Sequence, residues 1–358
     1  RSGALAPYPL SQMPGDAHSV TDERVAPVRW GILGAAGIAL RKAIPGMQRS
    51  ALAQVVAIAS RDIAKARAAA SELGIPRAYG SYQELIDDPD VEAIYIPLPN
   101  HLHVPWSIRA AERGKHVLCE KPIALTAKEA RQLLAARDRT GVKIGEAFMV
   151  RTHPQWLKVK EIIASGRIGD LRLISGHFSY YRRDPADVRS RVEWGGGALL
   201  DIGCYPITMS RWLFGAEPTE VIGLIDRDPQ MKIDRLTSGL LRFERGQATF
   251  SCAMQLVAFQ AVQIFGTEGR IAASFHATPR DASRIYVDDG SDLIGGGGVE
   301  TITFQPVDQF TIQANRFSRA IRGVGTVPVS LEDAIGNMAV IDALFRSAES
   351  GRWERPES

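Results

Sequence analysis

The chain has 358 residues, 45% of them hydrophobic, and its 43 basic and 40 acidic residues leave a formal net charge of only +3. This length predicts two domains, and so small a charge gives no reason to expect a nucleic acid or an acidic membrane surface as partner. No apolar run approaches a membrane span, and the three cysteines and seven histidines lack metal-site spacing, so we interpret the cysteines as buried thiols of a reducing compartment.

Residues 1–25 form a separate zone at the start of the chain. Pro7, Pro9 and Pro14 fall in a stretch with almost no apolar periodicity, and it lacks the hydrophobic core of a secretory signal. We expect a flexible tail, or an arm that wraps a neighbouring subunit. Together with the cysteines this favours a cytoplasmic protein. An exported protein freed of its signal would begin similarly, so a periplasmic location stays open.

A nucleotide-binding pattern follows. Residues 28–33 predict a buried strand and residues 40–47 a helix. The turn between them begins with Gly34, Ala35, Ala36, Gly37 and Ile38. Strand, glycine turn and helix point free backbone amides and the positive helix end at a pyrophosphate. Alanine stands at two fingerprint positions, so this pattern by itself also fits an ordinary strand-to-helix turn.

The end of the next predicted strand, residues 54–59, indicates which dinucleotide would bind. An acidic residue usually binds the ribose diol of NAD at this place. Here Ser60 and Arg61 supply a hydroxyl and a guanidinium, which suit the 2′-phosphate of NADP. Asp62 follows and could still face the ribose. We therefore favour NADP and keep NAD as an alternative.

Helices and strands are predicted to alternate up to residue 149. The helices fall at 63–73, 81–86, 104–113 and 127–139, and the strands near 78–79 and at 91–96, 117–118 and 143–149. This order is typical of a doubly wound parallel sheet. We predict a dinucleotide-binding Rossmann domain over residues 26–149.

Two of these strands end in residues of chemical interest. The first runs into Pro97, Leu98, Asn100, His101 and His103, where the nicotinamide half of a dinucleotide would lie. The second ends in Glu120-Lys121-Pro122, and proline cannot continue a strand because it has no donor for the ladder. Open α/β sheets bind ligands at the carboxyl ends of their strands, so a lysine here could hydrogen-bond a substrate oxygen. A surface turn after a strand explains the same residues.

After residue 149 strands follow strands. A helix is predicted at 156–165, strand-like runs at 171–181, 221–225, 238–243, 248–254, 262–265 and 301–304, and a last helix at 331–347. The chain is therefore α/β first and α+β second, with a large, mostly antiparallel open sheet. We expect residues 150–358 to form a substrate-binding and oligomerisation domain. The open face of its sheet is the expected interface of a homodimer or homotetramer.

Residues 195–205 combine three glycines with an acid and a phenol. A helix from about Ala198 would place Asp201 and Tyr205 one turn apart on one face. The carboxylate could then orient the phenol for proton transfer. An aspartate and a tyrosine with satisfied hydrogen bonds in the core would show the same spacing.

Four blocks in this order resemble the family of glucose–fructose oxidoreductase and inositol dehydrogenase (the Gfo/Idh/MocA family). They are residues 31–34 with their turn, 97–103 leading to 120–122, 195–205 and, more weakly, 266–270. Together they extend from about Val28 to the C-terminus. Many members carry a histidine where this chain has Tyr205, which resembles the branch of glucose–fructose oxidoreductase, D-xylose dehydrogenase and dihydrodiol dehydrogenase.

The resemblance implies an NAD(P)-dependent oxidoreductase that transfers a hydride between nicotinamide and a secondary or hemiacetal hydroxyl of a sugar or polyol. It makes Tyr205 the acid/base and Lys121 the residue that binds the reacting oxygen, with Glu120 and Asp201 in support. Glu120 and Lys121 are also candidate cofactor contacts, relatives carry a cis bond at the proline that follows, and no metal is needed. Further candidates to line the substrate pocket are His101, His103, Tyr181, Arg182, Arg183 and Trp194.

Two other functions stay open. The same branch includes trans-dihydrodiol dehydrogenase, and the sequence does not separate a sugar from a cyclic diol. A dinucleotide-binding sensor without turnover is the alternative from another class. The joint presence of Lys121, Asp201 and Tyr205 argues against the sensor.

Overall fold

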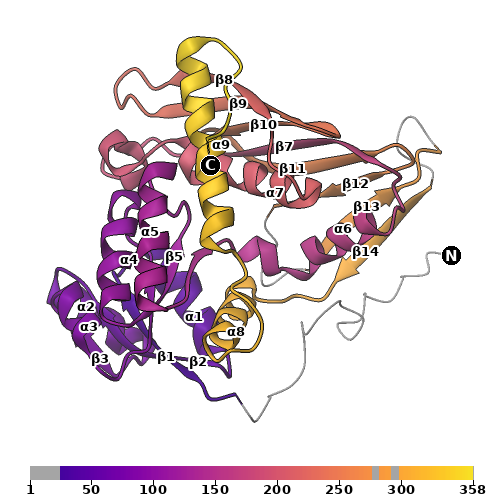
Figure 1. Ribbon diagram of the computed structural model, residues 1–358. Helices are drawn as coiled ribbons and strands as arrows, with labels where there is room; N and C mark the ends of the chain where they lie inside the picture. Colours follow the sequence, from indigo (N-terminus) through magenta and orange to yellow (C-terminus); the bar gives the residue numbers. More distant parts are fainter. Residues whose placement is uncertain (1–24, 276–281, 292–297, 358) are drawn as a thin grey trace. The chain divides into compact units, whose positions relative to one another are not determined.

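A computed structural model describes residues 25–275, 282–291 and 298–357, and the chain divides into two compact units (Figure 1). The parallel-sheet unit comprises the described residues up to Thr152 together with Asp308–Met338. The antiparallel-sheet unit comprises the described parts of His153–Val307 and Ala339–Ser358. The sequence analysis assigned residues 308–338 to the second domain, whereas here they group with the first. The expected tail or arm lies, up to residue 24, outside the described residues.

The parallel-sheet unit is built on six strands in the order β3-β2-β1-β4-β5-β6, all paired in parallel. The strands are β1 Val28–Leu33, β2 Ala53–Ala59, β3 Arg77–Tyr79, β4 Ala93–Ile96, β5 His116–Glu120 and β6 Ile144–Ala147. Every residue of β4 and β6 is buried, as in parallel sheets covered on both faces. This confirms the predicted doubly wound Rossmann sheet.

Side-chain caps begin three of the helical elements that the structure describes in this unit up to Thr152. These elements are η2 Ala39–Ala43, α1 Ile44–Gln48, α2 Ile63–Leu73, α3 Tyr82–Asp87, η3 Asn100–Leu102, α4 His103–Glu112, α5 Ala127–Thr140 and η4 Met149–Thr152, and the capped ones are α2, α3 and α5. Thr126 caps the start of α5, and Gly141 ends it in the left-handed conformation. Figure 1 shows α5 beside α4. The helix expected at 40–47 begins as the π-helix η2 and continues as α1.

A helix that the sequence analysis did not predict, α8 Gln309–Ile321, packs against this unit. The indole Nε1 of Trp30 donates to Ser318 Oγ at 3.2 Å, and the rings of Trp30 and Phe317 lie 5.7 Å apart. A Cβ built on Gly46 would lie 2.6 Å from the Cβ of Phe310, so the backbone of α1 approaches α8 closely. A segment far along the chain thus completes the core beside β1.

The antiparallel-sheet unit has an eight-stranded sheet in the order β14-β13-β12-β11-β7-β10-β9-β8. The strands are β7 Leu171–Tyr181, β8 Glu220–Arg227, β9 Asp234–Phe243, β10 Gly246–Ala253, β11 Gln255–Gly266, β12 Arg270–Ala273, β13 Ser283–Asp288 and β14 Val299–Phe304. Among these pairs only β7 with β10 is parallel, which confirms the predicted mostly antiparallel sheet.

The two faces of this sheet differ. Its helical elements are α6 Pro154–Ala164, η5 Val188–Ser190, η6 Val192–Trp194, η7 Leu199–Gly203, α7 Cys204–Phe214 and the later part of α9 Leu331–Ser350. On one face Gly176 lies against Pro206 of α7, and Gly239 against Leu344 of α9. The opposite face carries Leu224, which is 77% exposed, and a hollow of about 650 Å³ with serine, threonine and leucine side chains. We call this second face the open face.

None of the helices in the described part of the chain combines the length and the hydropathy that crossing a bilayer requires.

Candidate active site

The carboxyl ends of four strands gather the candidate residues of the parallel-sheet unit. Strands β2, β1, β4 and β5 are parallel neighbours, so the residues that follow them lie at one edge of the sheet. These are Gly34, Ala35, Ala36, Gly37, Ile38, Ser60, Arg61, Pro97, Leu98, Asn100, His101, His103, Glu120 and Lys121. The tertiary structure therefore brings together the cofactor candidates that the sequence placed in separate turns.

The turn after β1 fits a close backbone approach by a ligand. Gly34 has φ +114°, a conformation that favours glycine, and a Cβ there would lie 2.9 Å from Leu98 Cδ2. A Cβ on Gly37 would lie 2.6 Å from a guanidinium nitrogen of Arg41. The two glycines leave backbone rather than side chain at the edge of the sheet. The residues present therefore fit the pyrophosphate of a dinucleotide.

Three consecutive residues after β2 differ in their contacts. Asp62 is the N-cap of α2, and its Oδ1 accepts hydrogen bonds from Ala64 N at 2.9 Å and Lys65 N at 3.3 Å. The backbone amide of Asp62 donates to Ser60 Oγ at 3.2 Å. The carboxylate that the sequence left open as a ribose ligand is thus engaged in the cap. Arg61 is exposed at the same tip.

Lys121 directly follows Glu120, the buried last residue of β5. Glu120 accepts a hydrogen bond from the Tyr95 hydroxyl at 2.5 Å and one from the backbone amide of Lys121 at 3.3 Å. Since Tyr95 belongs to β4, Glu120 links the ends of two neighbouring strands. The Lys121–Pro122 peptide bond is cis, as the resemblance implied.

His103 is placed differently from a cofactor ligand. It is 0% exposed, and its Nδ1 and Nε2 each lie 2.7 Å from a backbone carbonyl, those of Pro122 and Leu98. Burial lowers the pKa of His103 to about 4, against the opposing effect of the two carbonyls. Both ring nitrogens are directed at the protein's own backbone.

In the antiparallel-sheet unit Asp201 lies in η7 and binds two side chains that the sequence analysis missed. Its carboxylate accepts a hydrogen bond from the hydroxyl of Tyr180, and Arg189 Nε lies 3.1 Å from the same oxygen. Burial, and then the charge of Asp201, raise the pKa of Tyr180 far above its ordinary value. The sequence paired Asp201 with Tyr205 by spacing, and the structure adds Tyr180 as a phenol that donates to the same carboxylate.

The alternation of side chains along β7 could have identified Tyr180 from the sequence. Tyr180 shares its face of β7 with Gly176, the face that packs on α7. The predicted candidate Tyr181 points to the other face and is 68% exposed. Arg189 carried no such signal, because it lies in η5, an element of only three residues, which is too short to show a periodicity.

Tyr205 lies in the first turn of α7 and is 2% exposed. Its ring packs against Phe178 and Phe275, with centroids 5.8 Å and 6.5 Å away. The phenol predicted as acid/base therefore stands in an aromatic environment.

A buried acid holds the start of η7. Asp234 Oδ2 accepts hydrogen bonds from Leu199 N at 2.6 Å and from the Thr237 hydroxyl at 3.0 Å. Burial raises the pKa of Asp234 to about 6. The three bonded groups fix the element that carries Asp201.

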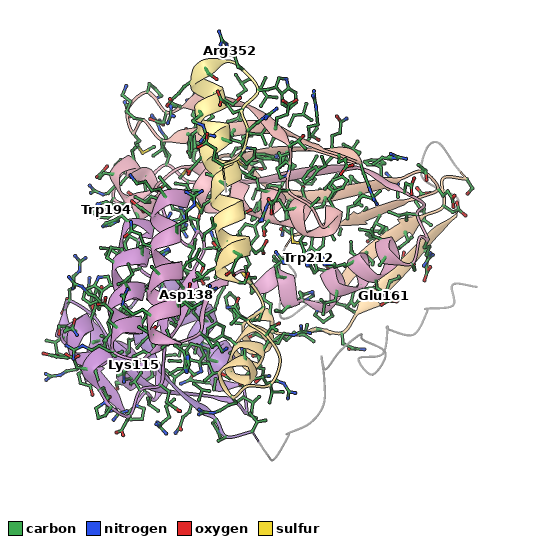
Figure 2. All side chains as sticks on the ribbon, in the orientation of Figure 1. Lys115, Asp138, Glu161, Trp194, Trp212 and Arg352 are labelled. Carbon is green, nitrogen blue, oxygen red and sulfur yellow. The ribbon has the colours of Figure 1, made fainter. Side chains whose placement is uncertain are left out.

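The remaining substrate candidates lie between β7 and η7. Arg182 forms an ion pair with Asp187, and Arg183 Nε lies 3.6 Å from Asp228. Trp194, labelled in Figure 2, has the guanidinium of Arg191 4.7 Å from its ring centroid. The described residues contain no group of three or more histidine, cysteine or acidic side chains arranged to hold a metal ion.

Two family models match this chain, one in each part. Residues 28–148 match the model of an oxidoreductase family with an NAD-binding Rossmann fold, and residues 156–272 match the GFO/IDH/MocA C-terminal domain. An uncharacterized oxidoreductase of Rhizobium meliloti is 51% identical over 91% of this chain and 98% of its own. The D-xylose 1-dehydrogenase (NADP(+)) 2 of Haloferax volcanii is 38% identical over 90% of this chain and 98% of its own.

Among solved structures, the 3-ketoreductase KijD10 of Actinomadura kijaniata, in complex with NADP and TDP-benzene, superposes with a TM-score of 0.83. It is 28% identical, and the match covers 90% of this chain and 98% of that one. These matches confirm the resemblance derived from the sequence blocks.

Proposed function

The chain belongs to the GFO/IDH/MocA oxidoreductase family, and from that premise we propose that it is an NADP-preferring sugar dehydrogenase. It acts on a secondary or hemiacetal hydroxyl. The observation that carries the proposal is the convergence of the Gly34 turn, the Ser60-Arg61 tip and Lys121 at one edge of the parallel sheet. A bound nicotinamide would supply the hydride chemistry.

The chain's own residues would bind and move the proton. Lys121 would hold the reacting oxygen through its ammonium group, and Tyr205 would take or return the hydroxyl proton. Glu120 would support Lys121 through its backbone amide. Asp201, held by Tyr180 and Arg189, would support Tyr205.

The preference for NADP is supported by the end of β2. Asp62 caps α2, which leaves the hydroxyl of Ser60 and the guanidinium of Arg61 as the groups at the tip. The planar guanidinium can donate two parallel hydrogen bonds to oxygens of the doubly charged 2′-phosphate. The xylose dehydrogenase relative is named for NADP, and the 3-ketoreductase was solved with it.

The decisive experiment is a panel of sugars, polyols and cyclic diols assayed with NAD and NADP in parallel. We expect oxidation of an aldose such as D-xylose with NADP at the lower KM. Oxidation of cyclic diols alone would make the protein a trans-dihydrodiol dehydrogenase. Tight dinucleotide binding without oxidation of any compound would make it a sensor.

Two variants test the assigned roles. Lys121→Ala and Tyr205→Phe should each lower kcat by about a hundredfold or more, because a positioned acid/base contributes on that scale. Dinucleotide affinity, measured by fluorescence titration, should stay within threefold in Tyr205→Phe. Near wild-type turnover in both variants would refute the mechanism.

We also propose that the open face joins subunits into a homodimer or homotetramer. Leu224, Phe259 and Tyr286 are large, exposed hydrophobic side chains on strands of this sheet. Their exposure on a sheet face that no helix in the described part of the unit covers supports an association surface there. Light scattering of Leu224→Asp should show a smaller particle than the wild type, whereas an unchanged mass would place the interface elsewhere.

A further inference from the structure

We propose that His103 is a positioning residue for Lys121: its buried ring braces the loop after β4 against the loop after β5. This inference rests on the proposed role of Lys121. Pro122, whose carbonyl contacts the ring, directly follows that lysine in the chain.

Strand pairing between β4 and β5 ends before the loop that carries Lys121. Pairing of β4 with β5 ends at Ile96 and Cys119, and pairing of β5 with β6 ends at Glu120. Pro122 has no N–H, so it cannot extend the ladder. Beyond the last pair, contacts other than strand pairing must fix the loop that carries Lys121.

His103 supplies such a contact to both loops. Nδ1 lies 2.7 Å from the Pro122 carbonyl oxygen and Nε2 lies 2.7 Å from the Leu98 carbonyl oxygen. Leu98 in turn reaches the glycine turn, since its Cδ2 would lie 2.9 Å from a Cβ on Gly34. One ring therefore connects the loop beside the dinucleotide turn with the loop of the reactive lysine.

The residue after Pro122 is fixed independently. The backbone amide of Ile123 donates to Glu146 Oε1 at 2.7 Å. Loss of the His103 contact should thus leave the later part of the loop in place and release mainly the segment next to Lys121. The expected defect is a misdirected lysine in a folded protein.

The two contacts can be separated by amide side chains. The amide of asparagine reaches about as far as Nδ1, so His103→Asn can keep the Pro122 contact and loses the Leu98 contact. The amide of glutamine reaches about as far as Nε2, so His103→Gln can keep the Leu98 contact and loses the Pro122 contact. The neutral ring carries one N–H, and the proposal requires that Nδ1 bears it and donates to the Pro122 carbonyl, so loss of that hydrogen bond should have the larger local effect.

We expect His103→Gln to lower kcat at least tenfold, with dinucleotide Kd within threefold of wild type, and His103→Asn to keep kcat within threefold. In a Lys121→Ala background, His103→Gln should lower kcat by less than twofold further, because the brace acts through the lysine. The matched control is His116→Gln. That histidine lies at the other end of β5 and accepts a hydrogen bond from Lys143 N at 2.9 Å, so its loss should leave kcat unchanged.

Equal losses of kcat in the two His103 variants, or an additive loss on top of Lys121→Ala, would show a general structural role and overturn the inference. Wild-type kcat in His103→Gln would also overturn it, provided Lys121→Ala shows its expected loss of kcat. A wild-type kcat in Lys121→Ala would instead refute the proposed function, so the two failures are distinguishable. Thermal unfolding of each variant, with and without dinucleotide, establishes that the protein compared is folded.

Discussion

The hydroxyl of Tyr180 donates a hydrogen bond to the carboxylate of Asp201, across 21 positions of sequence. Arg189 Nε lies 3.1 Å from the same carboxylate oxygen. Asp201 is therefore held in one orientation by a strand and a loop that both precede its own helix. This arrangement makes Tyr180 a partner of the proposed active site.

Tyr180→Phe should lower kcat/KM about tenfold, because Asp201 loses a hydrogen bond while keeping its contact with Arg189. Asp201→Ala should cost more, since Arg189 would then be left without this carboxylate. Steady-state kinetics measures both. Tyr181→Phe, on the exposed face of the same strand, is the control and should behave as wild type.

Arg61→Ala should weaken NADP binding at least tenfold and leave NAD binding within threefold, because only NADP offers the 2′-phosphate. Asp62→Ala should lower the free energy of unfolding by about 1 kcal/mol through loss of the N-cap, without changing the ratio of the two affinities. Calorimetric titrations and urea unfolding separate these effects. A larger loss of NAD than of NADP affinity in Asp62→Ala would show that Asp62 binds the ribose.

Gly197→Ala should disrupt the entry to η7. Gly197 has φ +117°, and a Cβ there would lie 1.8 Å from Asp234 Oδ1, so a methyl group would displace the acid that binds Leu199. We expect a loss of at least about 2 kcal/mol in the free energy of unfolding and a fall in kcat. Gly215→Ala is matched, because it has φ +64° with nothing within 4 Å, and it should cost only about 1 kcal/mol with normal kcat.

Asp234 should give a measurable pH dependence of stability. Its pKa is raised from 3.8 to about 6 in the folded protein, so the folded state binds more protons than the unfolded state between these values. The contribution of the protonated acid is therefore present at low pH and declines as the pH rises through about 6.

Asp234→Asn lacks this titration. The stability of Asp234→Asn relative to wild type should rise by about 1–3 kcal/mol between pH 4 and pH 7. Urea unfolding at several pH values, performed on both proteins in the same buffers, provides the comparison. A difference that does not change with pH would contradict the raised pKa.

Phe317→Ala should destabilise the parallel-sheet unit by about 3–5 kcal/mol, because Phe317 is fully buried and packs against Trp30. Phe317→Leu retains most of the volume and should cost less than about 1.5 kcal/mol. Urea unfolding followed by tryptophan fluorescence would detect the loss. Equal stability of the two variants would indicate that α8 contributes little to the core beside β1.

Local chemistry explains the parts of the fold that were predictable. Helix α2 runs over the predicted residues 63–73, because Asp62 caps its start and Gly74 ends it in the left-handed conformation. Strand β7 matches the predicted 171–181, where alternation reports a face packed on one side. The glycine turn and Glu120-Lys121-Pro122 followed from strand ends and from the resemblance. All of these signals lie within a few residues of the structure they specify.

The sequence by itself determined the two fold classes, the alternation of strands and helices up to residue 149 and the family, because each depends on periodicity, caps and short motifs. Only the tertiary structure decided that α8 returns to β1, that Tyr180 donates to Asp201, and that His103 faces the carbonyls of Leu98 and Pro122. The physical reason is the same in each case. A buried group needs a packing or hydrogen-bonding partner, and any segment of the chain can supply one. Which segment supplies it depends on how the whole chain packs.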